Sequence, residues 1–157
     1  MKRIAGVFLI MLMSASVWAQ DYNTALGVRG GMFSGLSLKH FVSGTDAFEG
    51  VVATHYRGFL IMGMYQKHAR AFDAPGLNWY YGGGAHTGFY EKRYTPWFSS
   101  SHSGSISTFG IVGAVGIEYK IDDIPVTIGA DITPALNLIG HTGLWLGSGL
   151  TLRYTFN

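Results

Sequence analysis

The end of the chain alternates between large apolar and small or polar residues, and this pattern constrains the fold more than any other feature of the sequence. Between Gly149 and Phe156, every second residue is leucine, tyrosine or phenylalanine, and the residues between them are glycine, threonine or arginine. Side chains of an extended strand point alternately to its two faces, so one face of this segment is apolar and the other is polar. Such a strand suits a wall with hydrocarbon on one side and a polar interior on the other.

The first 19 residues predict export. Lys2 and Arg3 form a basic start, the run from Ile4 to Met13 is almost wholly apolar, and small residues stand at the spacing of a cleavage site around Ala19. These are the three parts of a secretory signal peptide. The apolar run is shorter than the roughly 20 residues that a membrane-spanning helix needs. We therefore predict a cleaved signal peptide over residues 1–19 and a mature domain over residues 20–157.

Charge and cysteine content exclude several classes of function. Without Lys2 and Arg3, nine basic residues remain against nine acidic ones, so the mature chain has a formal net charge of zero. A nucleic-acid partner is not expected, because binding phosphates requires an excess of basic residues and the mature chain has none. The chain has no cysteine, which excludes disulfides, cysteine nucleophiles, zinc-thiolate sites and a lipoprotein anchor.

The mature chain predicts strands rather than spanning helices. Aromatic residues make up 15% of the chain and charged residues only 13%, yet no apolar run after the signal peptide is long enough to span a membrane as a helix. The predicted strands cover residues 26–33, 36–42, 48–56, 59–68, 78–90, 108–120, 126–133 and 144–156. Strands that face lipid must close into a barrel to satisfy every backbone polar group, and single-chain bacterial barrels have an even number of strands. We predict an all-β protein, an eight-stranded antiparallel up-and-down transmembrane β-barrel, with outward loops at residues 91–107 and 134–143.

Charged side chains decide which face of each strand points inward, because an ionised group facing the bilayer midplane costs about 2 to 4 kcal/mol. Pointing the charges inward leaves an apolar belt outside, and glycines such as Gly147 and Gly149 share the inward face, where they leave room for long side chains. The predicted lumenal polar network comprises Arg29, Lys39, Glu49, Gln66, His68, His86, Glu118, Lys120, Asp131 and Arg153. The predicted membrane-interface aromatics near the strand ends are Trp79, Tyr81, Tyr119, Tyr154 and Phe156.

The lumenal set carries both signs of charge in near balance. Since buried charges must be paired, we interpret it as a structural network of ion pairs and hydrogen bonds that fills a polar lumen. A gated polar path or a small-ligand pocket is an alternative, and a metal site at His68, His86 and a nearby carboxylate is a third. We predict no cofactor and no bound metal.

A catalytic site at the outer rim would need a nucleophile and a base within hydrogen-bond reach. Lipid A deacylases of this size carry a His and a Ser two residues apart, and no His-x-Ser occurs in this chain. His141, Thr142 and Ser103 are the candidates for a lipid-modifying enzyme, whereas Asp122 and Asp123 precede a proline in a predicted periplasmic turn. We therefore predict no catalytic residues.

Four segments and the C-terminal strand resemble known barrels. Residues 36–41 (LSLKHF), 64–68 (MYQKH), 78–86 (NWYYGGGAH) and 124–135 (IPVTIGADITPA) are similar to a group of small outer-membrane β-barrel proteins from Bacteroidetes. Proteins of this group often have Glu at the position of Gln66. The group has no assigned activity. The last strand resembles the closing strand of outer-membrane barrels, whose terminal aromatic is recognised by the assembly machinery; here Phe156 is penultimate. More distantly, the chain is similar to barrels of the OmpA and OmpX type, whose roles are structural, adhesive or protective.

These observations predict an integral protein of the bacterial outer membrane with a structural or surface-interaction role. Its expected partners are outer-membrane lipid, lipopolysaccharide and, during biogenesis, the barrel assembly machinery, and we expect a monomer. The alternatives are an outer-membrane lipid-modifying enzyme and a soluble, exported, lipocalin-like binding barrel, in which the apolar face would point inward.

Overall fold

The computed structural model describes residues 22–55, 58–72, 74–91, 105–140 and 142–156. The predicted signal peptide, most of the predicted 91–107 loop, and the candidate residues His141 and Ser103 lie outside these ranges. Within the described residues, no helix is long and apolar enough to cross a membrane.

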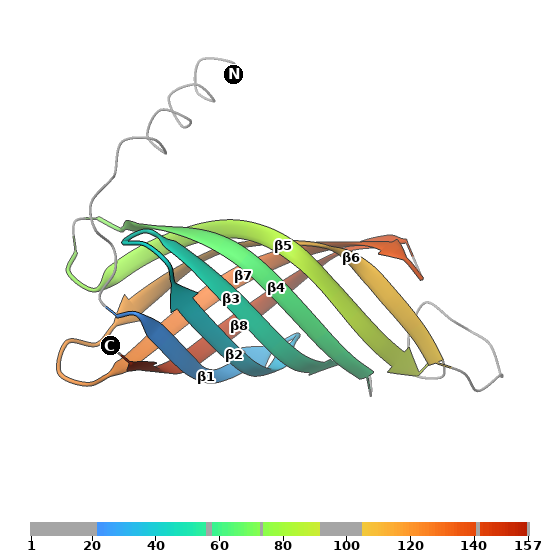
Figure 1. The fold of residues 1–157 in the computed structure, drawn as a ribbon, viewed down its shortest axis with the longest axis horizontal. Helices are drawn as coiled ribbons and strands as arrows, with labels where there is room; N and C mark the ends of the chain where they lie inside the picture. Colours follow the sequence, from blue (N-terminus) through green and yellow to red (C-terminus); the bar gives the residue numbers. More distant parts are fainter. Residues whose placement is uncertain (1–21, 56–57, 73, 92–104, 141, 157) are drawn as a thin grey trace, which may run out of the picture.

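Eight antiparallel strands close into one barrel, as the alternating pattern predicted (Figure 1). Each strand pairs with the next in sequence, and β1 pairs with β8 to close the sheet. The strands are β1 (Thr24–Gly31), β2 (Ser34–Phe41), β3 (Asp46–His55), β4 (Gly58–Arg70), β5 (Leu77–Glu91), β6 (Ser105–Lys120), β7 (Val126–Ile139) and β8 (Gly143–Phe156). Closure leaves no unpaired sheet edge, so the strands satisfy each other's backbone groups.

The barrel has two distinct ends. The start of β1 and the end of β8 lie at the same end as the β2–β3, β4–β5 and β6–β7 connections (Figure 1). We call this the terminal end and the other the distal end. The terminal-end connections are short, since only four to six residues separate the strands there.

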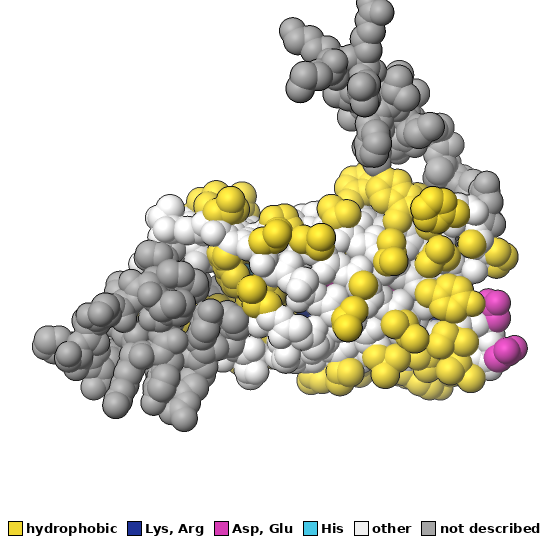
Figure 2. Space-filling model, turned by 180° about the vertical axis from the view of Figure 1, so that it is seen from behind, with side chains coloured by type: hydrophobic (Ala, Val, Ile, Leu, Met, Phe, Trp, Pro, Cys, Tyr) yellow, Lys and Arg dark blue, Asp and Glu magenta, His cyan; other side chains and the backbone are white. Residues whose placement is uncertain are grey.

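The outer surface is apolar and the inner surface carries the charges. In β8, Leu150 is 68% exposed whereas Arg153 is fully buried, and exposure alternates along the strand as its sequence predicts. Figure 2 shows hydrophobic side chains spread over one face of the barrel, with acidic side chains visible only at one end of it. A soluble protein normally buries its large apolar residues, so this inverted distribution is typical of a barrel in lipid.

Strand β7 is longer than the sequence predicted. The predicted strand stopped at Thr133 and assigned residues 134–143 to a loop, but β7 continues through Pro134 to Ile139. Pro134 has no N–H to donate, and the β6–β7 ladder pairs neither Thr133 nor Pro134. Gly113 lies beside it in β6, where an added Cβ would come 3.3 Å from the Pro134 ring. The neighbouring glycine therefore accommodates a proline inside a central strand, and the predicted outward loop is mostly strand.

Candidate functional site in the lumen

Arg153 stands at the centre of a buried ion network that crosses the lumen. Its guanidinium donates to Glu49, to Glu118 at 2.8 Å and to the Ser37 hydroxyl at 2.9 Å. Lys39 makes a second ion pair with Glu118 at 3.1 Å. These side chains project from β2, β3, β6 and β8, so the network ties four strands across the interior. Two cations face two carboxylates, and the network is neutral as a whole.

The two carboxylates of the network also accept hydrogen bonds from neutral side chains. Glu49 accepts hydrogen bonds from Ser37 at 2.6 Å and from the Gln66 amide at 2.5 Å, and Glu118 accepts one from Tyr22. Burial, together with the neighbouring Glu118 carboxylate, raises the pKa of the Tyr22 phenol well above its usual value, so Tyr22 donates as a neutral group. Buried charges are tolerated only when paired and hydrogen-bonded in this way.

Aromatic rings surround the Lys39 ammonium. Its Nζ lies 4.2 Å from the centre of the Tyr80 ring and 3.3 Å from Nε2 of His68. The His68 ring stacks on Tyr80 at 5.1 Å and contacts Phe41 at 4.7 Å. Lys39, His68 and Tyr80 are almost completely buried, so this part of the lumen is packed with side chains.

A separate ion pair lies closer to the distal end. Arg29 binds Asp131 through two hydrogen bonds of 2.5 and 2.6 Å, and Tyr80 donates to the same carboxylate at 3.0 Å. Glycines make this possible, as the sequence suggested. A Cβ at Gly149 would lie 2.5 Å from the Arg29 guanidinium, and one at Gly116 would lie 2.7 Å from the Tyr80 ring.

A large apolar cluster also lies in the interior, which the sequence analysis did not predict. The expected polar lumen followed from placing charges inward, but the alternation also points aliphatic and aromatic residues inward on the same strands. The buried cluster comprises Phe33, Val51, Ala53, Leu60, Met62, Met64, Tyr80, Tyr90, Val112, Ala114 and Ala135, with Ile106 and Trp145 packed against it. His86 lies near this cluster, with Nε2 2.7 Å from the Asn137 amide oxygen and its ring 6.0 Å from that of Trp145. The lumen is therefore polar in one part and apolar in another.

The predicted lumenal residues separate into groups. Lys39, Glu49, Gln66, His68, Glu118 and Arg153 come together in one network, and Arg29 and Asp131 form the other pair. Lys120 lies apart from both, because its ammonium donates to the carbonyls of Ile121 and Ile124 at 2.8 and 2.9 Å in the β6–β7 turn. His86 and His68 belong to different clusters. Among the described residues, no group of three or more His, Asp or Glu could hold a metal ion.

The sequence analysis missed four buried residues that bind the predicted lumenal side chains. Ser37 and Tyr22 bind the central carboxylates, Tyr80 binds Asp131, and Asn137 binds His86. Strand alternation could have placed Ser37 on the same inward face as Lys39, and Tyr80 on the same inward face as His86. Asn137 was assigned to a loop, and Tyr22 precedes the first strand, so no periodicity identified them.

Aromatic side chains form two bands on the outer surface. The predicted interface residues Trp79, Tyr81, Tyr119, Tyr154 and Phe156 all lie towards the terminal end, where Trp79 stacks on Tyr81 and Tyr154 packs against Phe156. Exposed phenylalanines from β4, β5 and β6 lie towards the distal end: Phe59, Phe89 and Phe109. Tyr119 and Phe109 are ten residues apart on β6. With about 3.3 Å per residue and a strand tilt of about 40°, that spacing gives about 25 Å, the height of the apolar band in membrane barrels.

Of the three candidates for catalysis, only Thr142 is among the described residues. Thr142 is exposed before β8, and its proposed partners His141 and Ser103 lie outside the described residues. Asp122 and Asp123 are exposed in the β6–β7 turn at the terminal end.

The closed eight-stranded antiparallel sheet is an OmpA-like barrel fold. Among solved structures, the chain is similar to the crystal structure of the N-terminal β-barrel domain of Pseudomonas aeruginosa OprF, with a TM-score of 0.64 and 17% sequence identity over 87% of this chain and 100% of that one. No protein-family model matches the sequence. No curated protein matches it either.

Proposed function

We propose that this protein is an integral outer-membrane barrel whose lumen is closed by its own side chains and whose role is structural or surface-interacting rather than catalytic. In this proposal residues 1–19 direct export and are removed, and the terminal end faces the periplasm. The outer surface contacts lipid and lipopolysaccharide. The barrel assembly machinery inserts the chain, which works as a monomer.

The observation that carries the proposal is the pairing of an apolar exterior with a buried, neutral ion network. Large apolar residues on the outer surface are strongly exposed, for example Leu150 at 68%, Val115 at 57% and Phe59 at 41%. Moving these side chains out of water into an apolar environment is favourable. Lipid supplies that apolar environment. The soluble lipocalin-like alternative needs the opposite arrangement, with charged residues outside, and is not favoured by these faces.

The interior favours a closed barrel over a pore. Arg153, Lys39, Glu49 and Glu118 are at most 2% exposed and bind one another across the lumen. An eight-stranded barrel is only wide enough for side chains to fill. The network therefore supports a structural wall with little ion conduction.

Fractionation and gel mobility test the proposal. The full chain with its first 19 residues is expressed in a Gram-negative host, and the separated membranes are run on a gel with and without boiling. We expect the protein in the outer-membrane fraction, with a mobility that changes on heating because a folded barrel resists detergent at room temperature. A soluble periplasmic protein without such a change would overturn the proposal and favour the lipocalin-like barrel.

Conductance separates the closed barrel from a pore. The mature chain, refolded into a planar lipid bilayer, should produce no steady channel current. A stable open level in the parent protein would contradict a structural role for the lumenal network.

A further inference from the structure

An ion pair stands on the outer surface of the barrel at the terminal end. Asp46 of β3 is directly opposite Lys67 of β4, with Lys67 Nζ 3.0 Å from Asp46 Oδ1. The Lys67 side chain is 51% exposed, and the pair shares the outward face with Phe48 and Tyr65, whose rings contact each other. Charges on a lipid-facing surface are costly except where they reach the headgroups. The pair therefore marks the headgroup level on this side of the barrel.

Hydroxyl groups hold the Asp46 carboxylate in place, but the carboxylate can still accept a further hydrogen bond. Oδ1 accepts from the Tyr65 phenol at 2.7 Å, and Oδ2 accepts from the Ser43 hydroxyl at 2.7 Å and only a long 3.4 Å contact from Thr45. Oδ2 can therefore accept one further strong donor, and within the described ranges the Lys67 ammonium uses only one of its three N–H groups, for Asp46. The cluster offers one fixed negative and one fixed positive group side by side.

A lane of small residues runs from this pair towards the middle of the apolar belt. Gly63 of β4 is paired with Gly50 on one side and Ala85 on the other, and Gly83 follows next to Tyr65. A Cβ added at Gly50 or Gly63 would meet no atom within 4 Å, so the surface here is open.

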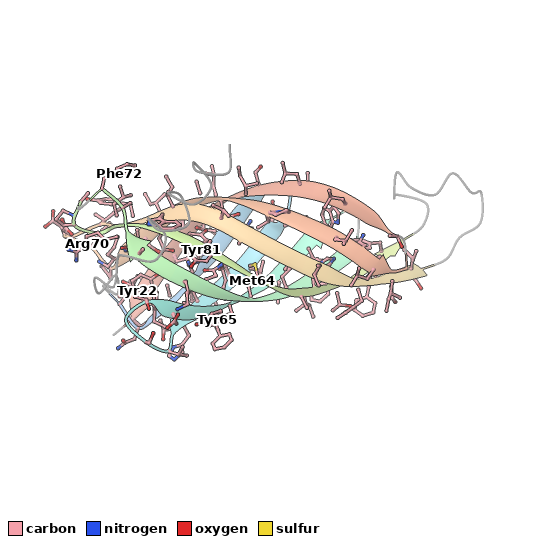
Figure 3. All side chains as sticks on the ribbon, turned by 90° about the horizontal axis from the view of Figure 1, so that it is seen from above. Tyr22, Met64, Tyr65, Arg70, Phe72 and Tyr81 are labelled. Carbon is pink, nitrogen blue, oxygen red and sulfur yellow. The ribbon has the colours of Figure 1, made fainter. Side chains whose placement is uncertain are left out.

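Tyr65 and Tyr81 lie beside this lane, and their side chains extend towards the terminal end. The Tyr65 phenol reaches Asp46, and Tyr81 stacks on Trp79 with the ring centres 5.5 Å apart. Figure 3 shows Tyr65 and Tyr81 in the half of the barrel that is nearer to Arg70 and Phe72. Neither ring is therefore directed over Gly63.

We propose that this face of β3, β4 and β5 binds one zwitterionic, amine-bearing glycerophospholipid. The lipid phosphate binds Lys67, the primary ammonium donates to Asp46 Oδ2, and an acyl chain lies over Gly63 and Ala85. The pair has no net charge, which favours a headgroup with one charge of each sign over an anionic one. This inference rests on the proposed membrane location, with the terminal end in the periplasm.

Native mass spectrometry of the folded mature chain measures the preference. The protein is equilibrated with equal amounts of phosphatidylethanolamine, phosphatidylcholine and phosphatidylglycerol that carry the same acyl chains. We expect one retained phosphatidylethanolamine, bound about tenfold more tightly than the other two, since about 1.4 kcal/mol separates them when one charge-assisted contact is lost. Phosphatidylcholine is the sharpest comparison, because its quaternary ammonium donates no N–H.

Three variants separate the parts of the site. Lys67→Gln should abolish the retained lipid, Asp46→Asn should remove the preference over phosphatidylcholine, and Gly63→Leu should weaken all three lipids by filling the lane. Gly30→Leu is the matched control, because Gly30 is also an outward glycine with open space but lies on β1. It should leave the preference unchanged. Each variant is first checked for folding by its heat-dependent gel mobility.

Other outcomes would overturn the site. Equal retention of the three lipids in a folded barrel would refute it while leaving the proposed membrane location intact. A dimer without bound lipid, disrupted by Gly63→Leu, would assign the face to a second copy of the chain. Failure of the parent chain to insert into bilayers at all would instead refute the proposed function on which the site depends.

Discussion

Replacement of Arg153 by leucine tests the lumenal network most directly. Arg153 is fully buried and binds Glu49, Glu118 and Ser37. Arg153→Leu removes the cation without removing either carboxylate. Glu118 keeps its ion pair with Lys39, whereas Glu49 keeps only the neutral donors Ser37 and Gln66.

The expected cost is that of one uncompensated buried carboxylate. Breaking a buried ion pair by removing one partner typically costs about 3 to 5 kcal/mol, since the remaining charge is neither solvated nor paired. We therefore expect Arg153→Leu to lower the free energy of unfolding by about that amount. Adding Glu49→Gln should restore more than half of the loss, because the neutral amide needs no cation.

Urea unfolding of the mature chain refolded into lipid vesicles provides the assay, with tryptophan fluorescence and gel mobility as two readouts. Asp122→Asn is the control, because Asp122 is exposed in the β6–β7 turn and its replacement should change stability by less than about 0.5 kcal/mol. An Arg153→Leu protein within about 1 kcal/mol of the parent would refute the reasoning. So would a double variant less stable than the single one.

Three further predictions concern the wall of the barrel. Leu150→Arg puts a charge on the exposed face near the middle of β8 and should destabilise the inserted barrel by about 2 to 4 kcal/mol, measured by the same unfolding assay; an unchanged value would contradict a lipid-facing position. Gly149→Ala would bring its Cβ within 2.5 Å of the Arg29 guanidinium and should cost about 1 to 3 kcal/mol, whereas Gly50→Ala, with open space, should cost nothing; equal effects would refute the packing argument. Phe156→Ala should lower the amount of folded protein in the outer membrane, as gel mobility of membrane fractions reports, while leaving refolding into vesicles in vitro much less affected; normal membrane levels would argue against recognition of this aromatic.

The sequence predicted most of the strands and their inward faces, because the side chains of a strand alternate between its two faces along the chain. In β8, the alternation from Gly149 to Phe156 determined which side chains point inward, and the same rule applied in the other seven strands. The length of β7, by contrast, was not predicted. Pro134 is a strand breaker by local rules, and its acceptance depends on Gly113 in the neighbouring strand, which a local reading does not pair with it.

The sequence alone determined the class of the molecule: alternation, scarcity of charge and the absence of a spanning apolar run after residue 19 predicted a closed eight-stranded barrel with its charges inside. Tertiary structure decided which charges meet. Arg153 and Glu49 are 104 positions apart, and only closure of the barrel and the register of its strands bring them together. The same closure gathered Phe33, Leu60 and Met62 into an apolar part of the lumen. Alternation specifies the direction of a side chain, but the partner it meets across the lumen depends on the stagger of all eight strands.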